Sequence, residues 1–375
     1  MKKFLNAVFL ISGTAIGAGV IALPLAAANL SFLQVALFVV LGVFVAYYSS
    51  CMALALSRHV GKGTGIAELS RQLAGQGTFA LSIAGFYMLS LALLSAYFAG
   101  LTDTIRSLLG IPTMYITMLC GLGLAVMLLL NIKVFNNLNA ILFLVLIASL
   151  AVITFSIADF NVRSSCFGFA MNRGMLCFLP IIFTSFGVQN ICAHVCNYLA
   201  LDMKQIQRAF KVGLIIPAVV YFVWIIAVLT SIHDASFWER LCAQEIGVGE
   251  LVSFLCANAE FPTMPIIFKV LTFSAMATSA IGIGLGLLGS IRETYIHDKR
   301  LALSIVVGIP VLVAIFYPNA FVKILAFGAM IATLFVVFIP YYLLQKIDKK
   351  NAYNPKHLLC LFFAIGILVC EFLSW

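Results

Sequence analysis

Three glycines and two hydroxyl residues interrupt the first apolar stretch of the chain, in the run Ser12-Gly13-Thr14-Ala15-Ile16-Gly17-Ala18-Gly19. Each glycine weakens a helix by about 1 kcal/mol relative to alanine, so a helix through this run unwinds most easily here. Gly13 and Gly17 are four residues apart, a spacing that also suits close packing of two membrane helices. By itself the run therefore leaves two interpretations: a packing surface, or a broken helix that exposes backbone groups.

A second interruption favours the broken helix. The apolar stretch 175–199 contains the polar run Phe183-Thr184-Ser185-Phe186-Gly187-Val188-Gln189-Asn190. Its Thr184-x-x-Gly187 spacing repeats that of Thr14 and Gly17. Interrupted helices at corresponding places in two halves of a chain are typical of transporters with an inverted repeat and a binding site at the bilayer midplane. Unwound backbone offers N–H groups to a carboxylate and carbonyls to an ammonium, so the predicted site suits a zwitterion.

The composition places the chain in a membrane. Of the 375 residues, 63% are hydrophobic and only 9% are charged, whereas ordinary soluble domains have about a quarter charged residues. The apolar stretches are too long and too uniform for β-barrel strands, so they predict helices. The net charge of +9 fits membrane orientation better than nucleic-acid binding, because the basic residues lie in short loops. Eleven spans are expected, at about 4–28, 32–57, 79–102, 113–130, 138–158, 175–199, 212–232, 264–291, 301–317, 320–344 and 357–375.

These spans form one all-α transmembrane domain over residues 1–375. The domain divides into a first repeat at about 4–158, a second repeat at about 175–344 and an extra helix at about 357–375. We interpret the first stretch as a span and not a cleaved signal peptide, because it is nearly long enough to cross the bilayer. Most of the 22 Lys and Arg residues then share a side with the N-terminus. The positive-inside rule therefore places the N-terminus in the cytoplasm and the C-terminus outside.

The ten cysteines do not predict a disulfide scaffold, because most lie in or near spans. Cys166 and Cys242 fall in predicted outer loops with Cys256 nearby, and a bridge between two of the three stays open. Cys192 and Cys196 flank a histidine in the sixth span. That histidine points about 200° away from the first cysteine on a helix, so no metal site is expected.

Two loops carry further patterns. In the basic segment 61–77, the residues Ile66, Leu69 and Leu73 recur at helical spacing, which predicts an amphipathic helix along the membrane face. The segment 233–262 alternates apolar and acidic residues. It predicts one or two short helices that act as an outer lid or as a solvated connection.

The motifs resemble those of the hydroxy and aromatic amino acid permeases, a branch of the amino acid–polyamine–organocation transporter superfamily. The similarity is carried by the run from Gly13 to Ala28 and by Pro180 to Gly187, Tyr198, Asp202, Gly213, Pro217, Tyr221, Trp224, Thr278 and Ser279. The first run is similar to the first span of bacterial tyrosine-specific permeases. The resemblance implies a sodium-symporter-like inverted repeat of spans one to five and six to ten. The chain departs from the family at Val188-Gln189-Asn190, where an aromatic residue and then histidine are common.

The expected substrate site lies between the two breaks, with Tyr97 and Phe186 offering ring contacts worth about 1 kcal/mol beyond burial. Its residues are Gly13, Thr14, Ala15, Gly17, Ala18, Gly19, Tyr97, Thr184, Ser185, Phe186, Gly187, Val188 and Gln189. As the resemblance implies, a cation site would combine Gly13, Ile16, Thr278 and Ser279; alternatively, the two hydroxyls bond back to their own helix. Oxygen ligands suit sodium, but relatives are mostly proton-driven, so the coupling ion is H⁺ or Na⁺. No other cofactor or metal is expected.

We therefore expect a secondary transporter of the bacterial cytoplasmic (inner) membrane that imports an aromatic amino acid, tyrosine first and tryptophan second, by cation symport. As the resemblance implies, spans one, two, six and seven would rock against the rest. The expected partners are the amino acid and lipid, without nucleic acid or an obligate protein partner. The alternatives are a permease for another small zwitterion, such as serine or threonine, and an intramembrane enzyme. An enzyme would need a nucleophile and base that the spans lack, a channel would need a continuous polar pore, and a pump would need a nucleotide motif.

Overall fold

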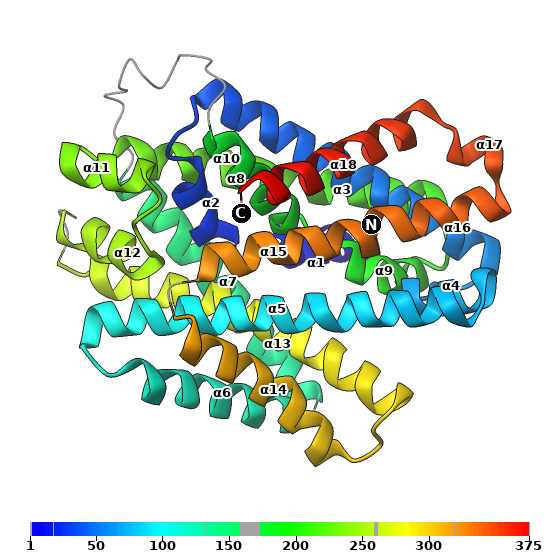
Figure 1. Ribbon diagram of the computed structural model, residues 1–375, viewed down its shortest axis with the longest axis horizontal. Helices are drawn as coiled ribbons and strands as arrows, with labels where there is room; N and C mark the ends of the chain where they lie inside the picture. Colours follow the sequence, from blue (N-terminus) through cyan, green and yellow to red (C-terminus); the bar gives the residue numbers. More distant parts are fainter. Residues whose placement is uncertain are drawn as a thin grey trace.

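The computed structural model describes residues 2–17, 19–130, 132–157, 173–258, 262–318 and 320–374, and within these ranges every regular element is a helix (Figure 1). The helices of the first half are α1 (Lys2–Ala15), α2 (Gly19–Ala27), α3 (Phe32–Val60), α4 (Ile66–Ala74), α5 (Gln76–Leu109), α6 (Thr113–Leu129) and α7 (Ile132–Ile157). The second half contains α8 (Arg173–Ser185), the 3₁₀ turn η2 (Gln189–Ile191), α9 (Cys192–Tyr198), α10 (Met203–Thr230), α11 (Ala235–Cys242), α12 (Val248–Ala257), α13 (Met264–Thr294), α14 (Lys299–Phe316), α15 (Phe321–Thr333), the π-helix η3 (Leu334–Phe338), α16 (Ile339–Ile347), α17 (Lys349–Ala352) and α18 (Pro355–Ser374).

Each predicted span coincides with one helix or with consecutive helices. Among the described residues, six helices are long and apolar enough to cross a membrane, and α1 and α2, which are bent by 52° relative to each other, pass the same test as a pair. Large apolar side chains cover the outside, and Phe155, Phe316 and Phe362 are 86%, 74% and 68% exposed. Such exposure is unfavourable in water and suits lipid. The chain is therefore a multi-pass membrane protein, while the eleven-span inverted repeat stays a prediction.

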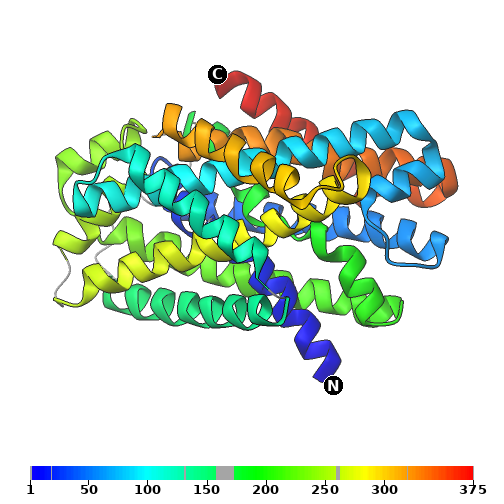
Figure 2. The ribbon, with the colours of Figure 1, turned by 90° about the horizontal axis from the view of Figure 1, so that it is seen from below.

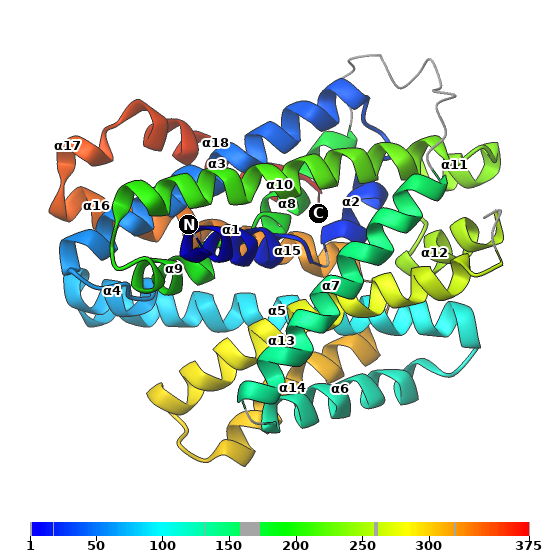
Figure 3. The ribbon, with the colours of Figure 1, turned by 180° about the vertical axis from the view of Figure 1, so that it is seen from behind.

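One group of helices is joined by polar side chains. It contains α1, α2, α3, α8, α9 and α10, and Figure 3 shows α10 running alongside α1 and α3. Ser12 in α1 donates to the Gly213 carbonyl in α10 at 2.9 Å. Asn197 in α9 exchanges two hydrogen bonds with the backbone of Gly63, at 3.0 and 2.9 Å. In an apolar environment such bonds hold helices together, and we call this group the bundle.

The remaining long helices pack around α5, which runs the length of the molecule (Figure 1). Helices α6, α13, α14 and α15 all contact it, and α7 packs on α13. We call this group the scaffold. Figure 2 shows the N-terminal end of α1 and the C-terminal helix α18 on opposite sides of the assembly in that view.

The helices predicted in the segments 61–77 and 233–262 are present. In the segment 61–77 the helix is α4, but Ile66 and Leu69 are buried and α4 packs on α5 and α16. Protein therefore covers the apolar face of α4, and the position of this helix along the membrane face stays a prediction. At the opposite end of the molecule lie α11 and α12 (Figure 1).

Helices α11 and α12 bridge the bundle and the scaffold. Asn29, just after α2, donates to the Cys242 carbonyl in α11 at 2.6 Å. The backbone N–H of Gly249 in α12 donates to the Asp103 carboxylate in α5 at 2.8 Å. The described part of the segment 233–262 is therefore packed against both groups of helices and is not a solvated loop. Of the three cysteine pairings left open, the one between Cys242 and Cys256 is not formed. The two pairings with Cys166 cannot be placed, because Cys166 lies outside the described residues.

Candidate functional site

Both glycine-containing runs break their helices. Helix α1 ends at Ala15 and α2 begins at Gly19, while α8 ends at Ser185 and the chain resumes at Gln189 in η2. Between α8 and η2 the backbone makes short turns, from Gly187 N–H to the Thr184 carbonyl at 3.1 Å and from Val188 N–H to the Phe186 carbonyl at 2.8 Å. Ala18, which was expected to bind substrate, lies outside the described residues.

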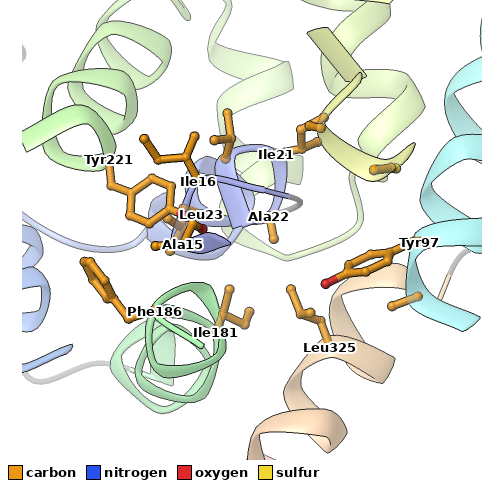
Figure 4. Close-up of a cluster of buried hydrophobic side chains, with 14 of the residues drawn as sticks. Ala15, Ile16, Ile21, Ala22, Leu23, Tyr97, Ile181, Phe186, Tyr221 and Leu325 are labelled. Atoms are coloured by element: carbon orange, nitrogen blue, oxygen red, sulfur yellow. Dashed lines mark hydrogen bonds between the residues drawn. The ribbon is translucent and has the colours of Figure 1, made fainter. Parts of the chain in front are cut away.

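Tyr221 of α10 links the two breaks. Its hydroxyl donates to the Ala15 carbonyl at 2.5 Å and lies 3.2 Å from the Ser185 carbonyl. Figure 4 shows the Tyr221 ring beside Ala15 and above Phe186. The carbonyls at the ends of α1 and α8 are therefore already partnered by a tyrosine, which the sequence did not predict.

Two glycines permit close approach at the breaks. A Cβ atom on Gly19 would lie 2.3 Å from Ser185 Oγ and 2.6 Å from Ser185 Cβ, so α2 meets α8 there directly. A Cβ atom on Gly17 would lie 2.3 Å from Ser279 Oγ in α13. The run 12–19 thus combines the two interpretations given for it. Its helix is broken, and its glycines also allow close packing against neighbouring helices.

A cavity of about 1440 Å³ adjoins both breaks. It continues toward the end of the molecule that carries α4, where Glu68 and Arg71 line it and form a 2.7 Å ion pair. The hydrogen bond from Arg71 lowers the pKa of the Glu68 carboxyl below its usual value. These two side chains are about one third and one half exposed, so the cavity opens at this end. Among its described lining residues there is none from α11 or α12.

Most of the expected substrate residues line this cavity: Gly13, Thr14, Ala15, Gly17, Gly19, Tyr97, Thr184, Ser185, Gly187 and Gln189. Phe186 and Val188 do not, because the turn after α8 directs them into the protein, where both are fully buried. The Phe186 ring packs against Tyr221 with centroids 5.5 Å apart, and it occupies the space above Gly42 of α3. The described aromatic lining residues are Tyr97, Phe9, Phe79, Phe86, Phe143, Phe183 and Phe335.

The expected cation residues are only partly brought together. Thr278 and Ser279 line the cavity, and their hydroxyls donate to the carbonyls of Ser274 at 2.8 Å and Ala275 at 3.0 Å in their own helix. Ile16 does not line the cavity and its side chain is buried. Since each hydroxyl uses its proton within α13, its oxygen is left to accept from a donor or to face a cation.

The geometry defines a membrane transporter with an internal cavity at two helix breaks. The chain belongs to the tryptophan/tyrosine permease family, which it matches over residues 1–373, as the resemblance in its motifs implied. It is 24% identical to tyrosine-specific transport system 1 of Haemophilus influenzae, covering 95% of this chain and 91% of the relative.

Further relatives carry other substrate names. The chain is 23% identical to glutamine transporter 2 of Aliivibrio fischeri, covering 97% of this chain and 94% of the relative. It is 25% identical to a tryptophan-specific transport protein of Pseudomonas aeruginosa, covering 94% and 88%. Family membership therefore establishes a relationship to amino acid transporters and leaves open which amino acid is carried.

Proposed function

We propose that this protein is a secondary transporter that imports an aromatic amino acid, tyrosine first and tryptophan second, together with H⁺ or Na⁺. The observation that carries the proposal is that two broken helices face one cavity. The family relationship supports an amino acid as the substrate. No cofactor beyond the coupling ion is required.

The substrate carboxylate would bind at the start of α2. A helix N-terminus carries unpaired N–H groups and a partial positive charge, which together favour an anion. Gly19 lies at this start and lines the cavity. We therefore assign the carboxylate to the backbone N–H groups at the start of α2.

The substrate ammonium would bind hydroxyl oxygens. Thr14 donates to the Leu10 carbonyl at 2.8 Å, Thr184 to the Ile181 carbonyl at 2.9 Å, and Ser185 to the same carbonyl at 2.7 Å. Their protons are engaged, so these oxygens can only accept, which suits an ammonium and not a carboxylate. The two breaks thus offer binding partners to both charged groups of a zwitterion.

Alternating access would move the bundle against the scaffold. The bundle is cross-linked internally by the Ser12–Gly213 and Asn197–Gly63 hydrogen bonds. It contacts the scaffold where α8 packs on α15 and α10 packs on α7, and both groups line the cavity. The cavity opens beside α4, which we place in the cytoplasm together with the N-terminus, with the C-terminus outside. This is then the inward-facing state of an eleven-span inverted repeat with repeats at about 4–158 and 175–344 and an extra helix at about 357–375.

A second candidate is transport of a small polar amino acid such as glutamine, serine or threonine. It is favoured by the glutamine transporter among the relatives and by the hydroxyl and amide groups of the lining. Uptake of radiolabelled tyrosine into proteoliposomes, with proton and sodium gradients imposed separately, tests both candidates. Unlabelled tryptophan, phenylalanine, serine and glutamine serve as competitors.

We expect gradient-dependent accumulation that tryptophan inhibits and serine does not. Accumulation inhibited by glutamine and not by tryptophan would establish the second candidate. Failure to accumulate any of these amino acids under either gradient would refute both candidates.

A further inference from the structure

Gln189 is the first residue after the second helix break, and its side-chain amide is held in one orientation. Its Nε2 donates to Ser49 Oγ in α3 at 2.9 Å. Ser49 in turn donates to the Ala46 carbonyl at 3.1 Å. Because the Ser49 proton is engaged in its own helix, its oxygen accepts, and the partner it accepts from is the nitrogen end of the amide. The carbonyl end of Gln189 therefore points away from α3.

The carbonyl oxygen of Gln189 is open to the cavity. The residue is only 6% exposed, and it lines the cavity. Within the described part of the chain, its Oε1 atom has no hydrogen-bond partner and is not among the polar atoms sealed in the interior. An accessible atom on a nearly buried residue that lines a cavity faces that cavity. Gln189 thus presents a fixed acceptor there.

The cavity-lining residues that follow Gln189 in the chain, and those that follow Ser49 on α3, are mostly apolar. The next turn of the broken span contributes Ile191, Cys192 and Ala193, and Ala53 lies one turn beyond Ser49 on α3; all four line the cavity. Cys192 directs its thiol toward the Val188 carbonyl at 3.9 Å. A flat apolar group that carries one donor at its edge matches this wall.

We propose that Gln189 is a specificity-determining residue, whose carbonyl oxygen selects amino acids with a hydrogen-bond donor on the side chain, such as the phenol of tyrosine or the indole of tryptophan. The proposal rests on the proposed function, since it assigns the side-chain end of the same site. A bound substrate without a donor covers the Gln189 oxygen and leaves it without a hydrogen bond. The free energy lost in this way is larger than the free energy gained from a satisfied bond. Phenylalanine is therefore discriminated against, although its ring has the same shape.

Matched substrate pairs test this proposal. Tyrosine is compared with phenylalanine and O-methyltyrosine, and tryptophan with 1-methyltryptophan, as competitors of labelled uptake in proteoliposomes. For the wild type we expect the donor-bearing member of each pair to bind about tenfold more tightly or better. Gln189→Leu should bring each ratio close to one. Ser49→Ala should lower the ratios partway, because the amide then loses its fixed orientation.

Controls separate specificity from folding. Each variant is first compared with wild type for abundance in the membrane and for its size-exclusion profile. Gln189→Leu protein that is folded and loses tyrosine and phenylalanine binding in equal proportion, with an unchanged ratio, overturns the proposal. If no aromatic amino acid is carried, the proposed substrate fails, and the same ratio is measured with glutamine against methionine, which lacks the donor. An unchanged ratio in that pair overturns the role of Gln189 as well.

Discussion

The contact between Gly19 and Ser185 makes Gly19→Ala a sharp test of how the two broken helices pack. The added Cβ would lie 2.3 Å from Oγ, 2.6 Å from Cβ and 3.2 Å from Cα of Ser185. The Oγ atom can rotate away, whereas Cβ and Cα cannot. Helices α2 and α8 would have to separate by about 0.8 Å to reach the 3.4 Å of ordinary contact. Overpacking of this kind costs about 1–3 kcal/mol, and it displaces the start of α2.

We expect Gly19→Ala to lower both the thermal-unfolding midpoint and the initial rate of tyrosine uptake into proteoliposomes. The double variant Gly19→Ala/Ser185→Gly should recover part of the loss, relative to Ser185→Gly alone, because it removes the Oγ and Cβ contacts. Gly19→Ala/Ser185→Ala should not recover, because the Cβ contact remains. Wild-type stability and uptake for Gly19→Ala would refute the reasoning.

Gly17 provides the contrasting case. A Cβ atom there would lie 2.3 Å from Ser279 Oγ but 3.7 Å from Ser279 Cβ. The Gly17→Ala defect should therefore be relieved by Ser279→Ala, measured against Ser279→Ala alone. Gly123→Ala in α6 is the control, since no atom lies within 4 Å of its added Cβ. It should leave uptake and stability at wild-type levels.

Three further variants probe other parts of the structure. Tyr221→Phe removes the hydroxyl that joins the breaks and should cost about 1–3 kcal/mol of unfolding free energy, measured by thermal unfolding beside exposed Tyr115→Phe, which should be neutral. Gly187→Leu should abolish uptake while the protein stays in the membrane, as a membrane-fraction immunoblot would show; normal uptake would contradict a substrate role for this break. Asp234→Ala removes the cap of α11, and hydrogen exchange of residues 235–242 should accelerate. The hydrogen bond from the Phe237 N–H lowers the pKa of the Asp234 carboxyl in the folded protein. The charged carboxylate therefore caps α11 fully at pH values above the usual aspartate pKa. The cap is lost when the pH falls through the lowered pKa and the carboxylate is protonated.

The sequence predicted the helix breaks well, because glycine and hydroxyl residues in an apolar run are a local signal. It could not predict where Phe186 points. Helical periodicity ends at Ser185, and the turn from Val188 N–H to the Phe186 carbonyl directs the ring toward α3 and α10. The direction in which a side chain points after a helix break depends on the backbone dihedral angles, and a periodic sequence pattern does not encode those angles.

Hydrogen bonds between residues that are distant in the chain could likewise not be predicted from the sequence. Tyr221 and Ala15 are separated by 206 residues, and nothing local marks that tyrosine as the group that satisfies the break. For α4, the spacing of Ile66 and Leu69 predicted an apolar face, which is present and buried. Lipid and protein both cover such a face favourably, so the pattern alone could not decide between them.

A structure determined with tyrosine, in lipid nanodiscs, tests the location of the substrate site most directly. We predict density for one amino acid in contact with both breaks, with its carboxylate toward the first residues of α2 and its side chain toward Gln189. Tyrosine density elsewhere in the cavity, away from residues 13–19 and 184–189, would contradict this site.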